Sequence, residues 1–581
     1  MSPEPLDAAR FRERALPRLR LLYADRARAV LDDLLRRMDA HPRRPPHGSG
    51  ARYSQADVVL ITYADSIRRA GEAPLRTLAR FLEEQLAGAV NTVHFLPFCP
   101  SSSDGGFSVI DYKAVAPAHG SWDDIARIGA QHDLMMDLVL NHCSSESAWF
   151  QAFVRGEGTG HDFFHTLPAD TDVSQVVRPR THPLLQPFET ARGTQHVWAT
   201  FSRDQPDLDY GNPAVLLAMV DVLLTYIERG ARIVRLDAVA FLWKRLGTPC
   251  IHLDETHDVV KLMRDICDMV APDVILLTET NVPNDENLSY FGAGDEAHMV
   301  YQFSLPPLLL HALYAGDASA LTAWAASLRT PPPGCTFFNF TASHDGIGLR
   351  PVEGLLDERE LERLVAGMQR NGGLVSFRAV DAGNQRPYEL NVGLFDALRS
   401  SAKGRDRLQV QRFLAAQTAM IGLRGIPGVY IHSLTATPND YEGYDKTKHP
   451  RDINRHRWDE AALLARLRQP RGYGARVFRE HRRRLALRRW QAAFHPDASM
   501  EVLQLGPALF AFERLSLDGT QRILALHNVT PEEQRVPIAQ RALSRLPRRS
   551  LDLLSGVDID RSVTELLLEP YQCMWLAGAG S

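Results

Sequence analysis

The chain has 581 residues, and 66 Lys and Arg against 70 Asp and Glu give a formal net charge of −4. This near balance offers no electrostatic basis for binding nucleic acid, and 45% hydrophobic with 23% charged residues excludes collagen-like and disordered chains. The six cysteines are scattered without a C-x-x-C pair, so neither a disulfide scaffold nor a metal site is expected. The lack of an apolar leader or of a run of about 18 apolar residues predicts a cytoplasmic protein without a membrane partner.

Residues 1–55 are expected to form a helical extension and a linker. Between residues 5 and 38 apolar side chains recur at helical spacing, among them Leu16, Leu19, Val30 and Leu34. The stretch HPRRPPHGSG at 41–50 is rich in Pro and Gly, which is typical of a linker.

The next part of the chain, residues 56–495, alternates short apolar runs with helical patterns. Eight runs are continuous enough to be buried on both faces, as parallel strands are: VVLITY (58–63), TVHFLPF (92–98), LMMDLVLNH (134–142), RIVRLDAV (232–239), DVILLTE (273–279), MVYQFSL (299–305), TFFNFTASHD (336–345) and GVYIHSL (428–434). Eight such βα units predict an α/β fold, the (β/α)8 TIM barrel.

Two intervals are too long for simple crossovers and are expected to be insertions at strand ends, at 143–210 and 346–400. From 496 to 581 the pattern changes to alternating strands, which predicts a C-terminal all-β domain. The basic run at 482–489 is expected to be a solvated helix face.

Polar and ionisable residues gather at the ends of several predicted strands, where barrel active sites lie. One acid at a strand end is usually a cap or an ion-pair partner, but several converging on one rim would be costly without a function. The residues at these ends are Asp65, Asn141, His142, Arg235, Asp237, Glu279, His344 and Asp345.

These residues suit the cleavage of a glycosidic bond. Arg235 and Asp237 are two apart on a strand and share a face, so the guanidinium would keep the carboxylate ionised and oriented for attack on an anomeric carbon. Glu279 on the adjoining strand, with a raised pKa, would protonate the leaving oxygen. Asp345 would hold sugar hydroxyls, and His142 and His344 are either hydroxyl donors or satisfied buried imidazoles.

Four strings in this order resemble motifs of the α-amylase superfamily: DLVLNH (137–142), ARIVRLDAV (231–239), LTETN (277–281) and FTASHD (340–345). The resemblance implies Asp237 as the nucleophile, Glu279 as the acid/base, Asp345 as the transition-state stabiliser, and retention of anomeric configuration. Amylases usually carry Lys-His three and four positions after the nucleophile. This chain has Ala240 and Phe241 there, which argues against an endo-hydrolase of polysaccharides.

Further strings resemble the sucrose phosphorylase branch, including VLITYAD (59–65), GFSVIDY (106–112), HDGIG (344–348) and RDINRH (451–456). Within that branch, VRPRTHPLLQPF (177–188), TETNVP (278–283) and FGAGDEAHMVYQFS (291–304) are similar to the glucosylglycerate phosphorylases. By resemblance, the residues that hold the glucosyl ring are Asp65, Tyr112, His142, Arg235, His344, Asp345 and Arg451. Sucrose phosphorylases have His at the position of Tyr112, so fructose is not the expected leaving group.

A phosphorylase must bind phosphate in competition with about 55 M water, which calls for cations at the acceptor site. Arg180 lies in the first insertion, and Tyr388 and Glu389 lie in the second, so these three are the expected phosphate and acceptor residues. One anion pocket would then serve a glycerate carboxylate in one step and phosphate in the other. The alternative for Arg180 is a solvated loop arginine.

The expected function is therefore reversible, retaining phosphorolysis of a small α-glucoside. Glucosylglycerate and phosphate would give α-D-glucose 1-phosphate and D-glycerate, with no organic cofactor, no metal, and inorganic phosphate as co-substrate. The alternatives are phosphorolysis of sucrose or sucrose 6-phosphate, plain α-glucoside hydrolysis, and a catalytically inactive barrel. The sequence predicts no particular oligomeric state.

Overall fold

The computed structural model describes residues 6–44, 52–381, 384–537, 549–560 and 563–578. In these ranges eight parallel strands close into a barrel in the order β1-β16-β10-β9-β8-β7-β4-β3. The prediction of a TIM barrel is confirmed, and each strand falls in or at the edge of a predicted run: β1 Val59–Thr62, β3 Thr92–Phe95, β4 Asp133–Val139, β7 Ala231–Asp237, β8 Ile275–Thr278, β9 Met299–Tyr301, β10 Thr336–Asn339 and β16 Ile426–Tyr430.

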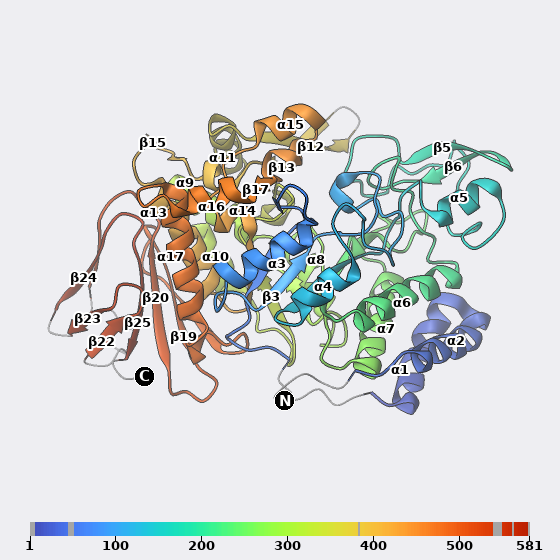
Figure 1. Ribbon diagram of the computed structural model, residues 1–581, viewed down its shortest axis with the longest axis horizontal. Helices are drawn as coiled ribbons and strands as arrows, with labels where there is room; N and C mark the ends of the chain where they lie inside the picture. The colour runs from blue at the N-terminus through green and yellow to red at the C-terminus, as the bar shows by residue number, and fades with distance from the viewer. Residues whose placement is uncertain (1–5, 45–51, 382–383, 538–548, 561–562, 579–581) are drawn as a thin grey trace.

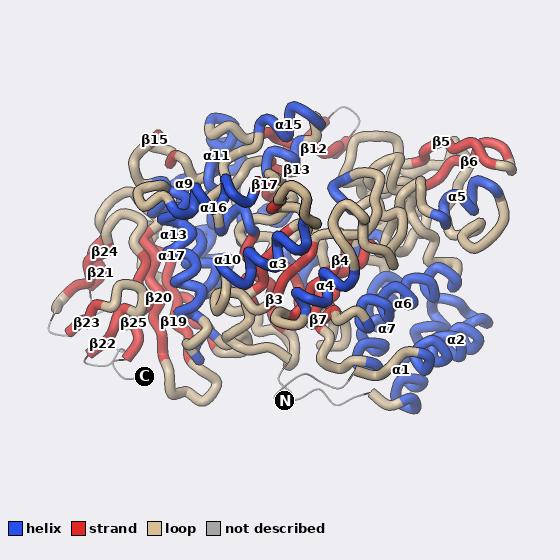
Figure 2. Tube along the Cα trace, viewed as in Figure 1, coloured by secondary structure: helices blue, strands red, loops and turns tan. Residues whose placement is uncertain are grey.

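Helices surround these strands, so the strands are buried on both faces, as their unbroken apolar runs indicate (Figure 2). The last predicted run differs from the structure, because its second half turns into the short helix α14 (Ile431–Leu434). The helices between and after the barrel strands are α3 Pro74–Gln85, α4 Trp122–Gly129, α6 Pro213–Glu228, α7 Asp254–Val270, α8 Asn284–Leu288, α9 Leu305–Ala315, α10 Ser319–Ser327, α13 Gln409–Gly422, α15 Tyr441–Thr447, α16 Glu460–Arg468 and α17 Tyr473–Arg488.

The two predicted insertions carry their own secondary structure. The first contains α5 (Ala148–Arg155) and the hairpin of β5 (Leu185–Thr190) with β6 (Gly193–Trp198). The second forms a three-stranded sheet in the order β11-β13-β12, from Ile347–Gly348, Asn384–Asn391 and Leu374–Asp381, flanked by α11 (Glu358–Arg370) and α12 (Leu394–Ala397). In Figure 1 the β5–β6 hairpin lies toward one end of the molecule, and β12 and β13 lie along its upper side.

Several other elements of the described residues are short. The small strands are β2 Ile67–Arg68, β14 Ser400–Ser401, β15 Gly404–Arg405 and β17 Trp458–Asp459, and β2 pairs with β17. The 3-10 turns are η1 Ala24–Arg26, η2 Asp104–Gly106, η3 Val239–Phe241, η4 Ser289–Phe291, η5 Arg350–Val352, η6 Pro450–Asn454 and η7 Ala492–Phe494.

The expected N-terminal helices are α1 (Ala8–Tyr23) and α2 (Ala27–Ala40), which lie beside α6 and α7 in Figure 1. Their apolar faces are buried, and Arg18 and Arg37 form ion pairs with Asp265 on α7 and Asp221 on α6. Most of the predicted linker at 41–50 lies outside the described residues. Helices α1 and α2 therefore pack against the outer helices α6 and α7 of the barrel, at the opposite end of the molecule from the C-terminal sheet (Figure 1).

The C-terminal region is all-β, as predicted. An antiparallel sheet runs in the order β18-β19-β20-β25-β22-β23, and β21 pairs with β24 beside it. The strands are β18 Ser499–Leu503, β19 Leu509–Leu515, β20 Arg522–Asn528, β21 Gln534–Pro537, β22 Arg549–Asp552, β23 Val557–Asp560, β24 Glu565–Leu568 and β25 Cys573–Gly578.

The basic run at 482–489 forms the predicted solvated face only in part, since Arg482 and Arg483 are exposed but Arg488 is not. Arg488, at the end of α17, is fully buried and donates to the carbonyl oxygens of Gln55, Ile421 and Gly425 at 2.6, 2.7 and 3.1 Å. Its guanidinium therefore ties α17 to the barrel by satisfying carbonyl groups that would otherwise be buried without partners.

Candidate active site

A cavity of about 1010 Å³ that opens to solvent lies at the carboxyl ends of the barrel strands. Nine of the twelve residues predicted from the sequence line it: His142, Arg180, Arg235, Asp237, Glu279, His344, Asp345, Tyr388 and Arg451. The other three, Asp65, Tyr112 and Glu389, do not. Strand ends and insertion loops distant in sequence thus contribute to one site.

Asp237 ends β7 and is held by a buried network of charges. Arg235 Nη1 donates to Asp237 Oδ1 at 2.7 Å and also contacts the carboxylate of Asp137 on β4. His94 on β3 lies 2.8 Å from the other oxygen of Asp137. Although burial opposes ionisation, Arg235 and His94 hold the pKa of Asp137 below its usual value. Arg235 therefore bridges two carboxylates and fixes the orientation of Asp237.

Glu279 follows β8 and is aligned by the residue after Asp237. The backbone N–H of Ala238 donates to Glu279 Oε2 at 3.1 Å, and Ala238 has a left-handed φ of 52°, a conformation that non-glycine residues rarely adopt. Burial raises the pKa of both Glu279 and Asp237. The Arg235 guanidinium opposes the rise in pKa of both carboxyl groups. Of the two, it forms an ion pair with Asp237.

Asp345 is an ionised carboxylate between basic partners. Arg451 Nη1 lies 2.6 Å from Asp345 Oδ1, and His344 Nε2 lies 3.4 Å from the same atom. Burial would raise the pKa of Asp345, but Arg451, together with His344, Arg235 and Arg455, holds that pKa well below its usual value. Burial lowers the pKa of His344 to about 3, so its imidazole is neutral, and the ring stacks on Phe107 at 4.8 Å.

His142 lines the cavity with a neutral ring, because burial lowers its pKa. Its Nε2 lies 3.1 Å from the carbonyl oxygen of Phe107. A sugar hydroxyl that bonded to this nitrogen would compete with that carbonyl.

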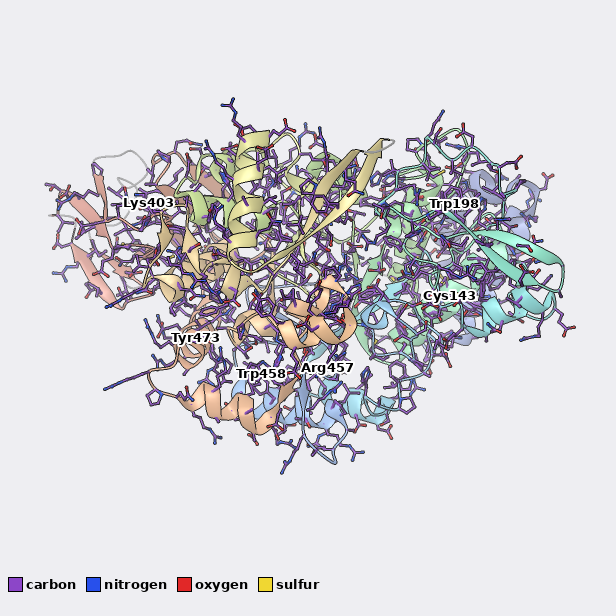
Figure 3. All side chains as sticks on the ribbon, turned by 90° about the horizontal axis from the view of Figure 1, so that it is seen from above. Cys143, Trp198, Lys403, Arg457, Trp458 and Tyr473 are labelled. Atoms are coloured by element: carbon purple, nitrogen blue, oxygen red, sulfur yellow. The ribbon has the colours of Figure 1, made fainter. Side chains whose placement is uncertain are left out.

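Tyr112 and Asp65, which were predicted to contact the sugar, are not among the residues that line the cavity. Tyr112 is buried, and its hydroxyl donates to the carbonyl oxygens of His142 and Val139 at 2.7 and 3.1 Å. Asp65 accepts hydrogen bonds from Arg68 and, at 2.8 Å, from Arg457, which is labelled beside Trp458 in Figure 3. Both side chains therefore form hydrogen bonds with other groups of the protein.

Of the three expected phosphate and acceptor residues, Arg180 and Tyr388 line the cavity and Glu389 does not. The Arg180 guanidinium lies 5.8 Å from the ring centres of both Phe201 and Tyr388, in cation–π contact. Glu389 does not line the cavity. It accepts from Arg451 Nη2 at 2.9 Å and from the backbone N–H of Gly346 at 3.1 Å, so it supports Arg451.

Several lining residues were not singled out from the sequence. Asp104 lies two residues before the GFSVIDY string and lines the cavity. Burial would raise its pKa, but Arg451 and Arg455, with smaller contributions from Arg180 and His449, lower it. Asn281 and Arg350 also line the cavity. Asn281 lies inside the quoted strings LTETN and TETNVP, and Arg350 follows HDGIG by two residues. Position in or next to a motif was the available signal for all three, because none of them ends a strand.

A lysine bridges two buried polar residues. Lys244 Nζ donates to Asn141 Oδ1 at 2.8 Å and lies 2.9 Å from Asp207 Oδ2.

Across the described ranges, no three His, Cys, Asp or Glu side chains gather in a way that would hold a metal ion. In the same ranges, no helix is long and apolar enough to cross a membrane.

Comparison with known proteins identifies the family. Residues 88–327 match the family model described as Alpha amylase, catalytic domain. A glucosylglycerate phosphorylase of Spirochaeta thermophila is 46% identical over 527 residues, covering 90% of this chain and 89% of that protein. A glucosylglycerate phosphorylase of Escherichia coli is 43% identical over 548 residues, covering 94% of this chain and 96% of that protein.

Among solved structures, the sucrose 6F-phosphate phosphorylase from Thermoanaerobacter thermosaccharolyticum superposes with a TM-score of 0.72 at 24% identity, covering 90% of this chain and 100% of that chain. This match supports the barrel with its C-terminal β domain. The resemblance seen in the sequence motifs is confirmed, and the chain belongs to the glucosylglycerate phosphorylases, glycoside phosphorylases of the α-amylase family.

Proposed function

We propose that this enzyme catalyses reversible phosphorolysis of glucosylglycerate, giving α-D-glucose 1-phosphate and D-glycerate with retention of configuration. The proposal rests on one observation above all. Asp237, Glu279 and Asp345 line a single cavity, in a chain 46% and 43% identical to two glucosylglycerate phosphorylases.

In the first step, Asp237 attacks C1 of the glucosyl group and Glu279 transfers its proton to the glycosidic oxygen, so D-glycerate leaves. Two buried carboxyl groups in one cavity share a proton readily, and Arg235 favours the ionised form of Asp237. Glu279 accepts only a backbone N–H from Ala238 among its described hydrogen bonds, so the proton resides on Glu279.

In the second step, Glu279 accepts a proton from phosphate, and a phosphate oxygen attacks C1 from the face that D-glycerate left. The bond to Asp237 breaks, and two inversions restore the α configuration. Asp345, ionised by Arg451, stabilises the positive charge that develops on the sugar ring in both transition states through hydroxyl hydrogen bonds.

Phosphate and the glycerate carboxylate are both anions that must enter beside Glu279. Arg180 and Tyr388 are the proposed phosphate ligands, since Arg180 has its charge against two aromatic rings and lines the cavity. Arg451, His142 and His344 would contact the glucosyl hydroxyls from the other side.

An acceptor panel tests this function. With α-D-glucose 1-phosphate as donor, we expect D-glycerate to accept glucose at least tenfold faster than fructose, fructose 6-phosphate or glycerol, and phosphate release to match the glucoside formed. Fructose or fructose 6-phosphate as the best acceptor would refute the proposed acceptor. Release of glucose from glucosylglycerate at the same rate with and without phosphate would show a hydrolase instead.

A further inference from the structure

Four arginines line the cavity, and they differ in how their charge is balanced. Arg235 contacts Asp137 and Asp237, and Arg451 contacts Asp345 and Glu389, so two guanidinium groups are neutralised by carboxylates. Arg180 lies against two rings and contributes to lowering the pKa of Asp104, after Arg451 and Arg455. The positive charge of Arg180 is therefore partly balanced by the carboxylate of Asp104.

Arg350 is different, because its side chain has no hydrogen bond or ion pair with any described residue. Its Nε is buried and lacks a partner. The titratable neighbour whose pKa it affects is His252. Burial, reinforced by His257 and Arg350, lowers the pKa of His252 to about 4, so this ring is neutral near pH 7 and offers no countercharge. A guanidinium that lines a cavity without a carboxylate is suited to an anionic ligand.

The position of Arg350 places it on the side of the proton donor. Asn281, two residues after Glu279, packs against Gly348, where a Cβ would lie only 2.5 Å from Asn281 Oδ1. The next residue, Leu349, donates its backbone N–H to the carbonyl oxygen of Tyr388 at 2.9 Å. Arg350 therefore follows a segment that contacts both Asn281, two residues after Glu279, and Tyr388, and all of these residues line the cavity.

Asn281 supplies a second unused group. Its side chain lines the cavity, and its buried Oδ1 has no hydrogen-bond partner among the described residues. An unpartnered buried acceptor and an unpaired guanidinium in the lining of one cavity suit a molecule that carries both a carboxylate and a hydroxyl.

We propose that Arg350 and Asn281 form the acceptor subsite, in which Arg350 binds the carboxylate of D-glycerate and Asn281 Oδ1 accepts a hydrogen bond from one of its hydroxyls. This inference rests on the proposed function and assigns its acceptor specificity to two residues. It separates the carboxylate site from the proposed phosphate ligand Arg180, so that the two anions need not share every contact.

The test compares D-glycerate with glycerol, which has the same carbon skeleton without the charge, using α-D-glucose 1-phosphate as donor. In Arg350→Leu we expect the ratio of kcat/KM for D-glycerate to kcat/KM for glycerol to fall by about 100-fold, the usual scale for losing one partner of a buried charged pair. Because both values come from one preparation, the ratio is independent of the folded fraction. Arg350→Gln provides the same ratio if the leucine variant is too weakly active to measure.

The matched control is Arg359→Leu, an exposed arginine on α11, for which the ratio should equal that of the parent enzyme. An unchanged ratio in Arg350→Leu and Arg350→Gln, with a parent enzyme that prefers D-glycerate, would overturn this inference and leave the proposed function intact. A parent enzyme with no preference for D-glycerate over glycerol would overturn both. A rise in the KM for phosphate with no change in the ratio would assign Arg350 to phosphate and also overturn the inference.

Discussion

The two sides of the cavity balance charge in different ways. On the glucosyl side, Arg235 and Arg451 each contact two carboxylates before any substrate binds, and Asp237 and Asp345 are oriented by these contacts. On the acceptor side, the residues come from the insertions and loops, and Arg180 and Arg350 have no carboxylate within ion-pair distance among the described residues.

This difference follows from what each side must bind. The glucosyl group is present in both half-reactions, so its side can be preorganised with every charge compensated. The acceptor side exchanges one anion for another, and an arginine already paired with a carboxylate would bind either anion weakly. Substitutions on the two sides should therefore have separable effects.

The largest effect is expected on the glucosyl side, from Asp237→Asn. Loss of the attacking carboxylate should lower kcat by about 10⁴-fold or more for both phosphorolysis and synthesis, since neither half-reaction can proceed without the covalent intermediate. The measurement is the steady-state rate in both directions, and Asp123→Asn, an exposed carboxylate on α4, is the control. A retained rate in Asp237→Asn would exclude this carboxylate as the nucleophile.

The next effect lies on the acceptor side, in Arg180→Ala. Removing this guanidinium should raise the KM for phosphate by roughly 10- to 100-fold, because a charge-assisted contact to the anion is lost. Arg178→Ala is a close control, since Arg178 belongs to the same RPR motif but does not line the cavity. An unchanged KM for phosphate in Arg180→Ala would remove Arg180 from the phosphate site.

A smaller effect tests the second layer of the glucosyl side, through Glu389→Gln. Glu389 touches Arg451 and not the cavity, so it is a positioning residue. We expect kcat/KM for the glucoside to fall by about tenfold, and the effects of Glu389→Gln and Arg451→Lys to be non-additive in a double-mutant cycle. Additive effects would mean that Glu389 acts independently of Arg451.

The barrel and the carboxylates proposed to be catalytic could be found from the sequence for a physical reason. Parallel strands buried on both faces are unbroken apolar runs, and the residue after such a run lies at the barrel rim, so Asp237, Glu279 and His344 could be placed by counting. The motif strings then assigned the family, and the comparisons confirm it.

Contacts made by loops were not accessible in this way. Asp65 was expected in the cavity, but the pairing of β2 with β17 brings Arg457 to it from 392 positions away. Arg350 and Asn281 were missed because their lack of partners depends on how the second insertion folds against β8. Side-chain partners of this kind depend on long-range packing, which local periodicity does not report.

The smallest effect on catalysis is expected for Tyr112→Phe. This variant tests whether Tyr112 contacts the sugar or only supports the backbone of residues near the cavity. The loss of the hydroxyl leaves the buried carbonyl groups of Val139 and His142 without this donor, which should lower the free energy of unfolding by about 1–3 kcal/mol. The KM for glucosylglycerate should stay within twofold of the parent value, because Tyr112 does not line the cavity. Denaturant unfolding and steady-state kinetics on one preparation separate these effects. A tenfold rise in KM at unchanged stability would instead make Tyr112 a sugar ligand, and the glucosyl side would then extend beyond the network of paired charges.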